Sequence, residues 1–448
     1  MPSLFEKLSR WRQDPRFVRV LRNSGYLFSS NTVSAALGFV QGVLAVRLLG
    51  IDGYGLVAGT ILVFASNVNR LLSFRMSEVL VKYADEALAR NERPRAAALV
   101  KGIGLTEMLT AATAYLVLLA LSPWAAATFA KDASTAPLFA VYGLFLLGNM
   151  VYETSTGVLQ TFKRFDRIAA VNLVQSITTA ALIGAAFIFG GGIPHVLFAY
   201  LAGKILASIT IASLAVLEMN RNLPGWRGAP LHVLTDWRGI LKFAVNTNLN
   251  GTVNLIVRDS APLFLGALST QIEVGYFKLA LSLINLVMLP IEPFIWPTYA
   301  ELTETVARQK WLEVLRLLRR VSVIAAAWTL AAGGGLAALG WWLIPLVYGA
   351  DSAPAYPAAV ILLLGFGFAN VLHWNRPLLL ALGMPSYPLI ASALVGAVQI
   401  ALVFVLVPRF GYLAMAALMP AYFVGSIGLI VRRGLAEVRR RAASAQAV

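Results

Sequence analysis

One segment of this chain carries a row of polar side chains through a mostly apolar stretch. Asn246, Asn250, Asn254 and Arg258 follow one another at every fourth position. Residues four apart share a face of an α-helix, so this spacing predicts a narrow polar stripe along one helix. The stripe indicates one of two roles. It either makes hydrogen bonds to neighbouring membrane helices or forms the wall of a hydrated cavity that binds a polar solute.

Charged side chains inside apolar runs give further candidates. A charge at the centre of a membrane span costs about 2.5 kcal/mol or more, so it faces a cavity or a partner. Lys204 lies near the middle of its apolar run, where it either lines a cavity or pairs with a carboxylate such as Glu107 or Asp259. Asn67 and Arg70 mark a second polar face. We expect Lys204, Asn67 and Arg70 to join the stripe in lining a substrate cavity.

The chain lacks the residue patterns of an enzyme. It has no cysteine, which excludes disulfides and thiolate metal sites. Its three histidines, at 195, 232 and 373, lie on separate segments without the spacing of metal ligands. No phosphate-binding loop of the form G-x-x-x-x-G-K-[ST] is present. We therefore expect no catalytic residue, no metal and no cofactor.

The segments that carry these candidates must be membrane helices. The mean hydropathy is +0.73 and only 13% of the residues are charged. Because about twenty apolar residues span a bilayer as a helix, the sequence predicts an all-α integral membrane protein with about twelve transmembrane helices. The expected spans are residues 26–49, 54–77, 98–121, 136–159, 167–190, 194–217, 239–266, 273–297, 321–345, 356–380, 386–407 and 411–431.

The distribution of basic residues predicts the orientation. Cytoplasmic loops are enriched in Lys and Arg, so both termini are expected in the cytoplasm. This bias also accounts for the net charge of +16 without a nucleic-acid partner, although the basic loops can contact anionic membrane lipids. Most of the 37 lysines and arginines fall in the two terminal tails and in the connections 75–101, 163–167, 221–242 and 308–320.

Short matches between the two halves indicate an internal repeat. Leu49-Gly50 recurs as Leu265-Gly266, and Gly53-Tyr54 recurs as Gly275-Tyr276, at an offset of about 220 residues. We expect two lobes of about six helices each, related by a parallel pseudo-two-fold repeat. The expected divisions are an amphipathic cytoplasmic segment (1–25), an N-lobe (26–217), a cytoplasmic linker (218–238), a C-lobe (239–431) and a basic cytoplasmic tail (432–448).

The turn after the first span carries a family resemblance. Residues Arg47 to Gly55 read R-L-L-G-I-D-G-Y-G. They resemble the R-x-L-G-x-x-x-Y-G signature of the polysaccharide transporter family, which includes the Wzx-type oligosaccharide flippases. The basic connection with Lys82-Tyr83-Ala84 also resembles that family, and the plan of spans agrees over the whole chain. Only the 47–55 turn carries over residue by residue, and there the expected role is structural or, for Arg47, anchoring at the outer interface.

The resemblance implies both a fold and an activity. It implies a V-shaped, two-lobe bundle of the multidrug/oligosaccharidyl-lipid/polysaccharide exporter superfamily in a bacterial inner membrane. It implies movement of an undecaprenyl-pyrophosphate-linked oligosaccharide from the inner to the outer leaflet for polysaccharide biosynthesis. The energy would come from an ion gradient, carried by a proton or sodium ion. Polysaccharide polymerase or glycosyltransferase machinery would be a further partner.

The candidate residues have the chemistry that such a substrate requires. A pyrophosphate favours Arg and Lys, and sugar hydroxyls favour amide and hydroxyl side chains. Asp259, Glu107 and Glu292 are acidic residues within the spans, and we expect the coupling ion to bind among them.

Three alternatives stay open from sequence alone. A cation-coupled drug or small-molecule exporter of the same superfamily would be expected to have an acidic, aromatic-lined cavity, whereas here basic residues balance the carboxylates. A membrane-embedded sugar polymerase or ligase would need a large outer loop with catalytic residues. A membrane scaffold without transport activity would not require the polar stripe.

Overall fold

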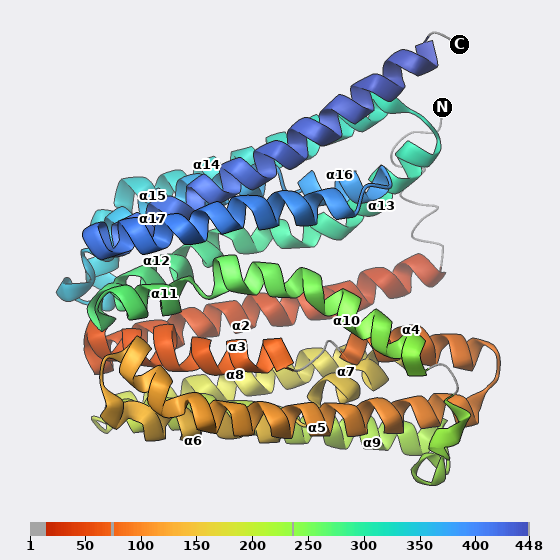
Figure 1. Ribbon diagram of the computed structural model, residues 1–448, viewed down its shortest axis with the longest axis horizontal. Helices are drawn as coiled ribbons and strands as arrows, with labels where there is room; N and C mark the ends of the chain where they lie inside the picture. The colour runs from red at the N-terminus through yellow and green to blue at the C-terminus, as the bar shows by residue number, and fades with distance from the viewer. Residues whose placement is uncertain (1–14, 73–75, 235–236, 447–448) are drawn as a thin grey trace. The chain divides into compact units, whose positions relative to one another are not determined.

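The computed structural model describes residues 15–72, 76–234 and 237–446, and every regular element in this part of the chain is a helix (Figure 1). Short π-helical and 3-10 segments interrupt the α-helices. The α-helices are α2 (Pro15–Tyr54), α3 (Leu62–Leu72), α4 (Met76–Ala89), α5 (Arg93–Ala125), α6 (Ala136–Gly148), α7 (Tyr152–Thr161), α8 (Phe165–Ile188), α9 (Ile193–Asn222), α10 (Trp237–Asn254), α11 (Ala261–Leu268), α12 (Gln271–Met288), α13 (Ile295–Ala307), α14 (Trp311–Tyr348), α15 (Ala355–Val371), α16 (Asn375–Ala381) and α17 (Ser386–Gln446).

Nine helical stretches of the described residues are long and apolar enough to cross a membrane. Two of them, 28–89 and 386–444, each hold two predicted spans, because the chain reverses at Gly50 (φ 71°) and at Gly411 (φ 58°) (Figure 1). A positive φ is readily adopted by glycine. Every predicted span except the seventh, 239–266, overlaps one of the nine stretches, and 26–49, 167–190 and 273–297 extend a few residues beyond theirs. The polar stripe makes α10 too hydrophilic to qualify.

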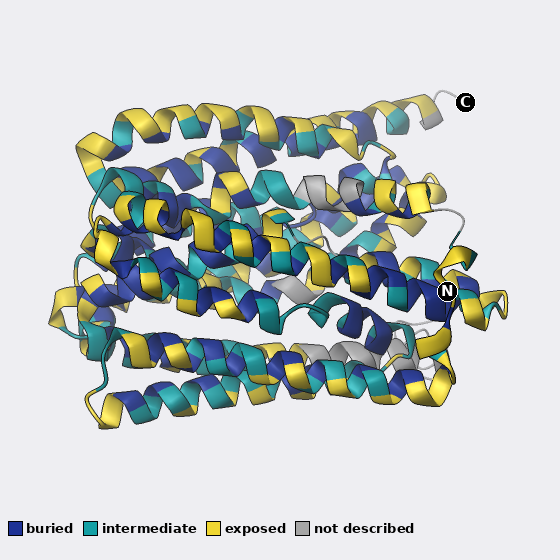
Figure 2. Ribbon diagram, turned by 60° about the horizontal axis from the view of Figure 1, so that its bottom comes forward, coloured by how far each residue is buried: buried dark blue, intermediate teal, exposed yellow. Residues whose placement is uncertain are grey.

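The outer faces of these helices suit contact with lipid. Large apolar side chains such as Leu109, Leu330 and Leu364 are exposed on the helix surfaces, and exposed positions recur along the helices in Figure 2. Only 17% of the most apolar window of α14 is buried inside the protein. In a membrane, lipid takes the place of a protein core on such faces.

Several spans predicted as continuous helices are broken. In the fourth span, α6 ends at Gly148 and α7 begins at Tyr152. In the tenth, α15 ends at Val371 and α16 begins at Asn375. The eighth span bends at Pro290 through the 3-10 segment η7 (Leu289–Phe294).

A side-chain hydrogen bond supports the bend in the eighth span. The Trp328 Nε1–H donates to the Val287 carbonyl at 2.8 Å. This bond satisfies a backbone acceptor next to the proline-containing segment, as the absence of water in a bilayer requires.

The chain forms two compact units by its internal contacts. Unit 1 comprises Met1–Gln41, Val68–Ser122 and Pro137–Leu249, and unit 2 comprises Gly42–Asn67, Pro123–Ala136 and Asn250–Val448. The contiguous N-lobe (26–217) and C-lobe (239–431) therefore remain a prediction. The units differ from them because two segments of the first half pack with residues of the second half.

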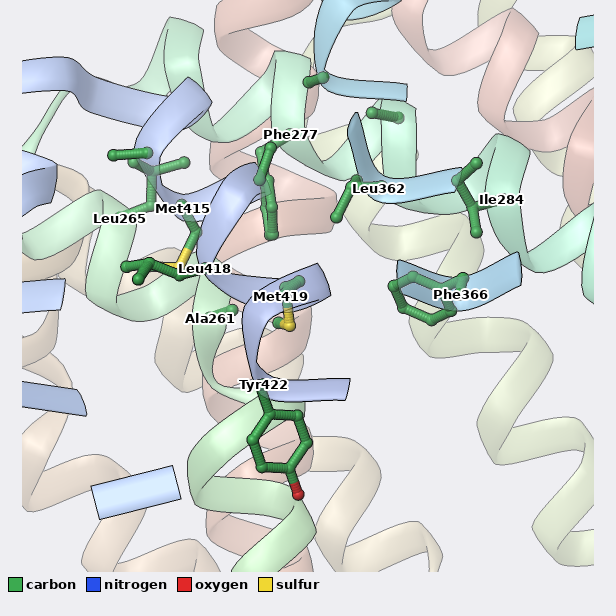
Figure 3. Close-up of a cluster of buried hydrophobic side chains, with 14 of the residues drawn as sticks. Ala261, Leu265, Phe277, Ile284, Leu362, Phe366, Met415, Leu418, Met419 and Tyr422 are labelled. Carbon is green, nitrogen blue, oxygen red and sulfur yellow. The ribbon is translucent and has the colours of Figure 1, made fainter. Parts of the chain in front are cut away.

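Each unit has its own apolar core. In unit 1, Leu80, Leu99 and Ile103 belong to a buried cluster that joins α4 and α5. In unit 2, Phe277 of α12, Leu362 of α15 and Met419 of α17 belong to a larger cluster, whose side chains converge in Figure 3. Tyr422 lies at the edge of this core, where α17 also borders a polar cavity.

Candidate substrate-binding site

A cavity of about 150 Å³ lies within unit 2 and is lined by α10, α16, α17 and the π-helical segment η6 (Leu255–Asp259). Its apolar wall includes Val253, Leu389 and Phe423. The polar lining consists of two arginines, two asparagines and two serines, namely Arg258, Arg376, Asn254, Asn375, Ser392 and Ser426. No carboxylate is among its described lining residues, so the cavity suits an anionic ligand with hydroxyl groups.

The end of the predicted stripe reaches this cavity. Asn254 is the last residue of α10, and Arg258 lies in η6. A π-helix has a wider turn than an α-helix and is often found at functional sites. The last step of the stripe runs through a π-helix instead of an α-helix, and Asn254 and Arg258 still line the same cavity. Ser260 ends the π turn, because both its amide and its hydroxyl donate to the Leu255 carbonyl at 2.8 Å.

The first half of the stripe consists of Asn246 and Asn250 on α10. The side chains of Asn246 and Asn250 lie outside the described residues. Their assignment to the cavity wall therefore remains a prediction.

Arg258 is held by its neighbour in sequence. Its Nε–H donates to Asp259 Oδ1 at 2.8 Å, and the arginine side chain remains 46% exposed. Lys278 on α12 is electrostatically attracted to the same carboxylate. Lys278 lies two turns into α12, which begins at Gln271. Arg258 is thus paired with Asp259 by a salt bridge, and Lys278 acts on the same carboxylate through electrostatic attraction.

Two further polar residues of the cavity, Asn375 and Arg376, lie at the break between α15 and α16. Asn375 donates to the Leu372 carbonyl at 2.7 Å, and Trp374 donates to the Ser322 hydroxyl at 2.7 Å. These bonds fix the break. The Arg376 guanidinium makes no hydrogen bond or ion pair within the part of the chain that the structure describes, so its donors are free for a ligand.

Sequence reasoning missed Asn375 and Arg376. Both residues lie near the end of the predicted tenth span, 356–380, where a charge is typical of the cytoplasmic boundary. The available signal was the polar run His373, Asn375 and Arg376 within an otherwise apolar stretch.

Asn67 and Arg70, expected to act together, lie in different units. Asn67 is 6% exposed, and its Nδ2 donates to the Ser260 hydroxyl at 2.9 Å. Asn67 is therefore brought to the segment that follows Arg258 and Asp259. Arg70 belongs to unit 1 and is exposed.

Lys204 in unit 1 is not paired with either of the carboxylates suggested as partners. Its Nζ lies 5.5 Å from the centre of the Phe145 ring, a cation–π contact. Among the described residues, no ion pair or hydrogen bond of its ammonium group is found. Ser208 links its helix to the break in the fourth span, by donating to the Lys204 carbonyl and to Asn149 Oδ1.

Glu107 lies at the same broken span. The carboxylate, only 1% exposed, accepts from the amides of Glu153 and Thr154 at 2.8 Å each and from the Thr154 hydroxyl at 2.6 Å. Glu107 thereby caps the first turn of α7, whose amides have no partner within the helix. The structure thus gives this candidate for ion binding a role in holding a helix end.

The other two acidic candidates differ. Asp259 is the partner of Arg258. The side chain of Glu292, in η7, lies outside the described residues. Within the described ranges, no three His, Asp or Glu side chains are grouped closely enough to hold a metal ion.

Comparison with known proteins gives related sequences. The model of a family described as polysaccharide biosynthesis proteins matches residues 20–295. The inner membrane protein YghQ of Escherichia coli strain K12 is 24% identical over 280 residues, which cover 61% of this chain and 78% of that protein.

Comparison of structures identifies the fold. An inward-facing multidrug resistance MATE family transporter of the MOP superfamily matches with a TM-score of 0.73 at 14% identity, over 92% of this chain and 96% of that one. The lipid II flippase MurJ, in an inward closed conformation, matches with a TM-score of 0.69 at 16% identity, over 91% and 87%. A MOP superfamily transporter from Pyrococcus furiosus, described by the reverse polarity of its binding pocket, has a TM-score of 0.64 at 13% identity, over 95% and 96%. The chain has the all-α membrane fold of this superfamily.

Proposed function

The chain belongs to the polysaccharide biosynthesis protein family, and from this premise we propose that it is a flippase for a lipid-linked oligosaccharide. The substrate is an oligosaccharide on undecaprenyl pyrophosphate, which passes from the inner to the outer leaflet of a bacterial inner membrane. The site opens to one side of the membrane at a time. The protein binds and moves its substrate without chemical change.

The observation that carries this proposal is the lining of the cavity in unit 2. Arg258 and Arg376 supply planar guanidinium groups, which form paired hydrogen bonds to phosphate oxygens. Asn254 and Asn375 supply amides, which donate to and accept from sugar hydroxyls. A drug or metabolite cation would be repelled by two arginines. The cation exporter is therefore the weaker candidate.

Lys204, Arg70, Asn246 and Asn250 complete the proposed set of substrate contacts. Lys204 is suited to this role because its ammonium group has only an aromatic ring as a partner among the described residues. An unpaired cation within a membrane span requires water or an anion. A negatively charged headgroup fills that requirement each time the substrate binds.

A proton or sodium gradient supplies the energy in this proposal. Asp259 is the leading site for the coupling ion, since it lies beside the cavity and is shared by Arg258 and Lys278. Binding of a cation at Asp259 would release both basic side chains toward the substrate. Glu292 remains a second candidate.

Both termini face the cytoplasm in this proposal. A periplasm-dependent reporter fused after Asp351 is expected to be active, and the same reporter fused after Pro230 is expected to be inactive. The reason is that basic residues gather in the connections on the Pro230 side. Reporter activity is measured in whole cells for both fusions. The opposite pattern would reverse the orientation of the chain in the membrane and, with it, the assigned direction of transport.

Deletion of the gene tests the proposed substrate. Lipid-linked repeat units are expected to accumulate in the inner leaflet, and surface or secreted polysaccharide is expected to be lost, because the saccharide cannot cross the bilayer unaided. Extraction and mass spectrometry of the lipid-linked saccharides measure the first effect. A deletion strain with normal polysaccharide and new sensitivity to cationic dyes would instead support the drug exporter.

A further inference from the structure

Two turns of unit 2 cross each other with almost no space between their backbones. The first is the π-helical segment η1 (Gly55–Ile61), all of whose residues are buried. The second is the start of α12 around Gly275. A Cβ atom added to Gly55 would lie 2.1 Å from the Gln271 carbonyl oxygen, and one added to Gly275 would lie 2.3 Å from the Ile51 carbonyl oxygen. Any larger residue at either position would force the two turns apart.

The crossing is reciprocal between the two halves of the sequence. Gly55 meets Gln271, and Gly275 meets Ile51. A shift of 220 residues carries Ile51 onto Gln271 and Gly55 onto Gly275. This shift is close to the offset of the internal repeat but not identical to it, because the repeat matches Gly53 to Gly275.

Buried polar groups accompany the glycines. The Thr60 hydroxyl, at 0% exposure, donates to Gln271 Oε1 at 2.8 Å. The amide group of Gln271 also donates to the Phe129 carbonyl, so one side chain joins three segments. Apolar residues would suffice for a contact that stays closed permanently. Polar side chains can hydrogen-bond to water when the contact opens, and this lowers the free-energy cost of exposing the surface.

Two basic side chains of the first half of the chain bond to helix ends of the second half, at α14 and α11. Arg47 donates to the Leu346 and Val347 carbonyls at 2.7 Å each. These carbonyls belong to the last turn of α14, where a cation is favoured by the helix dipole and by unpaired acceptors. Lys131 donates to the Ala267 carbonyl. Arg47 begins the R-L-L-G-I-D-G-Y-G turn, so this contact gives the first residue of that motif a defined partner.

We propose that the Gly55–Gly275 crossing, with the bonds of Thr60, Gln271, Arg47 and Lys131, is the outer gate of the transporter and is closed in this structure. This inference rests on the proposed function and on the orientation given above. In this proposal the glycine contact closes the path from the cavity to the outer side, and the side-chain bonds hold the segments together. Outward opening requires the glycine contact and these bonds to separate together.

A cysteine reporter tests the gate without requiring any knowledge of the substrate. The chain has no native cysteine, so Asn254→Cys in the cavity is the only thiol that can react. A membrane-impermeant maleimide is added from the outer side of spheroplasts. In the otherwise unchanged chain, labelling is expected to be slow. Adding Gly55→Ala or Gly275→Ala is expected to raise the labelling rate by about tenfold or more, since overpacking destabilises the closed contact.

Controls separate opening of the gate from general disruption. Gly334→Ala on α14 adds the same methyl group where no atom lies within 4 Å, and it is expected to leave labelling unchanged. Thr60→Val keeps the shape but removes the hydroxyl bond, so it is expected to raise labelling by a smaller factor. This variant decides the question if the glycine variants fail to accumulate.

The proposal is wrong if the variants that accumulate normally, Thr60→Val included, are labelled from outside at the rate of the Gly334→Ala control. In that event the crossing is a fixed structural contact. Failure of the proposed function gives a different result. If labelling increases in a protein that moves no saccharide, the gate proposal still holds and only the assignment of the substrate is wrong.

Discussion

Glutamine at both Arg258 and Arg376 is expected to weaken binding of the lipid-linked saccharide by about 100-fold or more, because each substitution removes one charge-assisted contact. A hydrogen bond to a charged group contributes about 1.5–3 kcal/mol, and about 1.4 kcal/mol corresponds to a factor of ten. Each substitution removes a guanidinium from the cavity lining. The measurement is the dissociation constant of the purified protein for the saccharide lipid in detergent.

Matched variants make this expectation specific. Arg376→Lys keeps the charge but loses the planar fork, so an intermediate loss is expected. Arg409→Gln removes an exposed arginine that is not part of the cavity lining, and its affinity is expected to be normal. Unchanged affinity in the double variant would remove this cavity from the account of substrate binding.

Alanine at Glu107 is expected to cost about 3 kcal/mol or more of stability. The carboxylate accepts from two backbone amides and one hydroxyl at the start of α7. A buried donor left without a partner costs about 1–3 kcal/mol. Thermal unfolding of the purified protein in detergent measures the loss as a lower midpoint.

Two further substitutions show whether Glu107 acts by capping α7. Glu107→Gln retains one oxygen acceptor, so its midpoint is expected to lie between those of the alanine variant and the original chain. Glu304→Ala removes an exposed carboxylate on α13 and is expected to have little effect. If Glu107→Ala unfolds at the original temperature while ion-driven transport is lost, Glu107 acts in ion coupling and the capping role is wrong.

Local signals in the sequence predicted much of the fold. Apolar runs separated by charged connections predicted the helices, and the boundaries between the first and second spans and between the last two spans fall where the chain reverses at Gly50 and Gly411. Each of these features depends on residues close together in the chain. Such features can therefore be predicted from short segments of the sequence.

The breaks in the fourth and tenth spans had no such local signal. The break after Gly148 is supported by Glu107 from another helix, and the break before Asn375 is supported by Ser322 through Trp374. Both supports lie far away in sequence. A reading of hydropathy alone continues a helix through them.

The candidate site was predicted only in part for the same reason. The polar stripe pointed to Asn254 and Arg258, because helical periodicity is a local property. Which charges meet is decided by the packing of distant segments: Lys278 lies near Asp259, and Glu107 lies at an amide-rich helix end. Arg376 was not predicted, because a basic residue near the end of a span is usually a topological signal.

Reconstitution into lipid vesicles tests the central claim most directly. Vesicles that carry the purified protein and a fluorescent undecaprenyl-pyrophosphate-linked oligosaccharide are treated with an external reagent that modifies only outward-facing saccharide. With the unchanged chain, saccharide from the inner leaflet is expected to become accessible over time, and faster when an ion gradient is applied. With glutamine at Arg258 and Arg376, only the saccharide that initially faces outward is expected to react. If inner-leaflet saccharide becomes accessible equally slowly in vesicles without protein and in vesicles with folded protein, the assignment of this chain as a flippase is wrong.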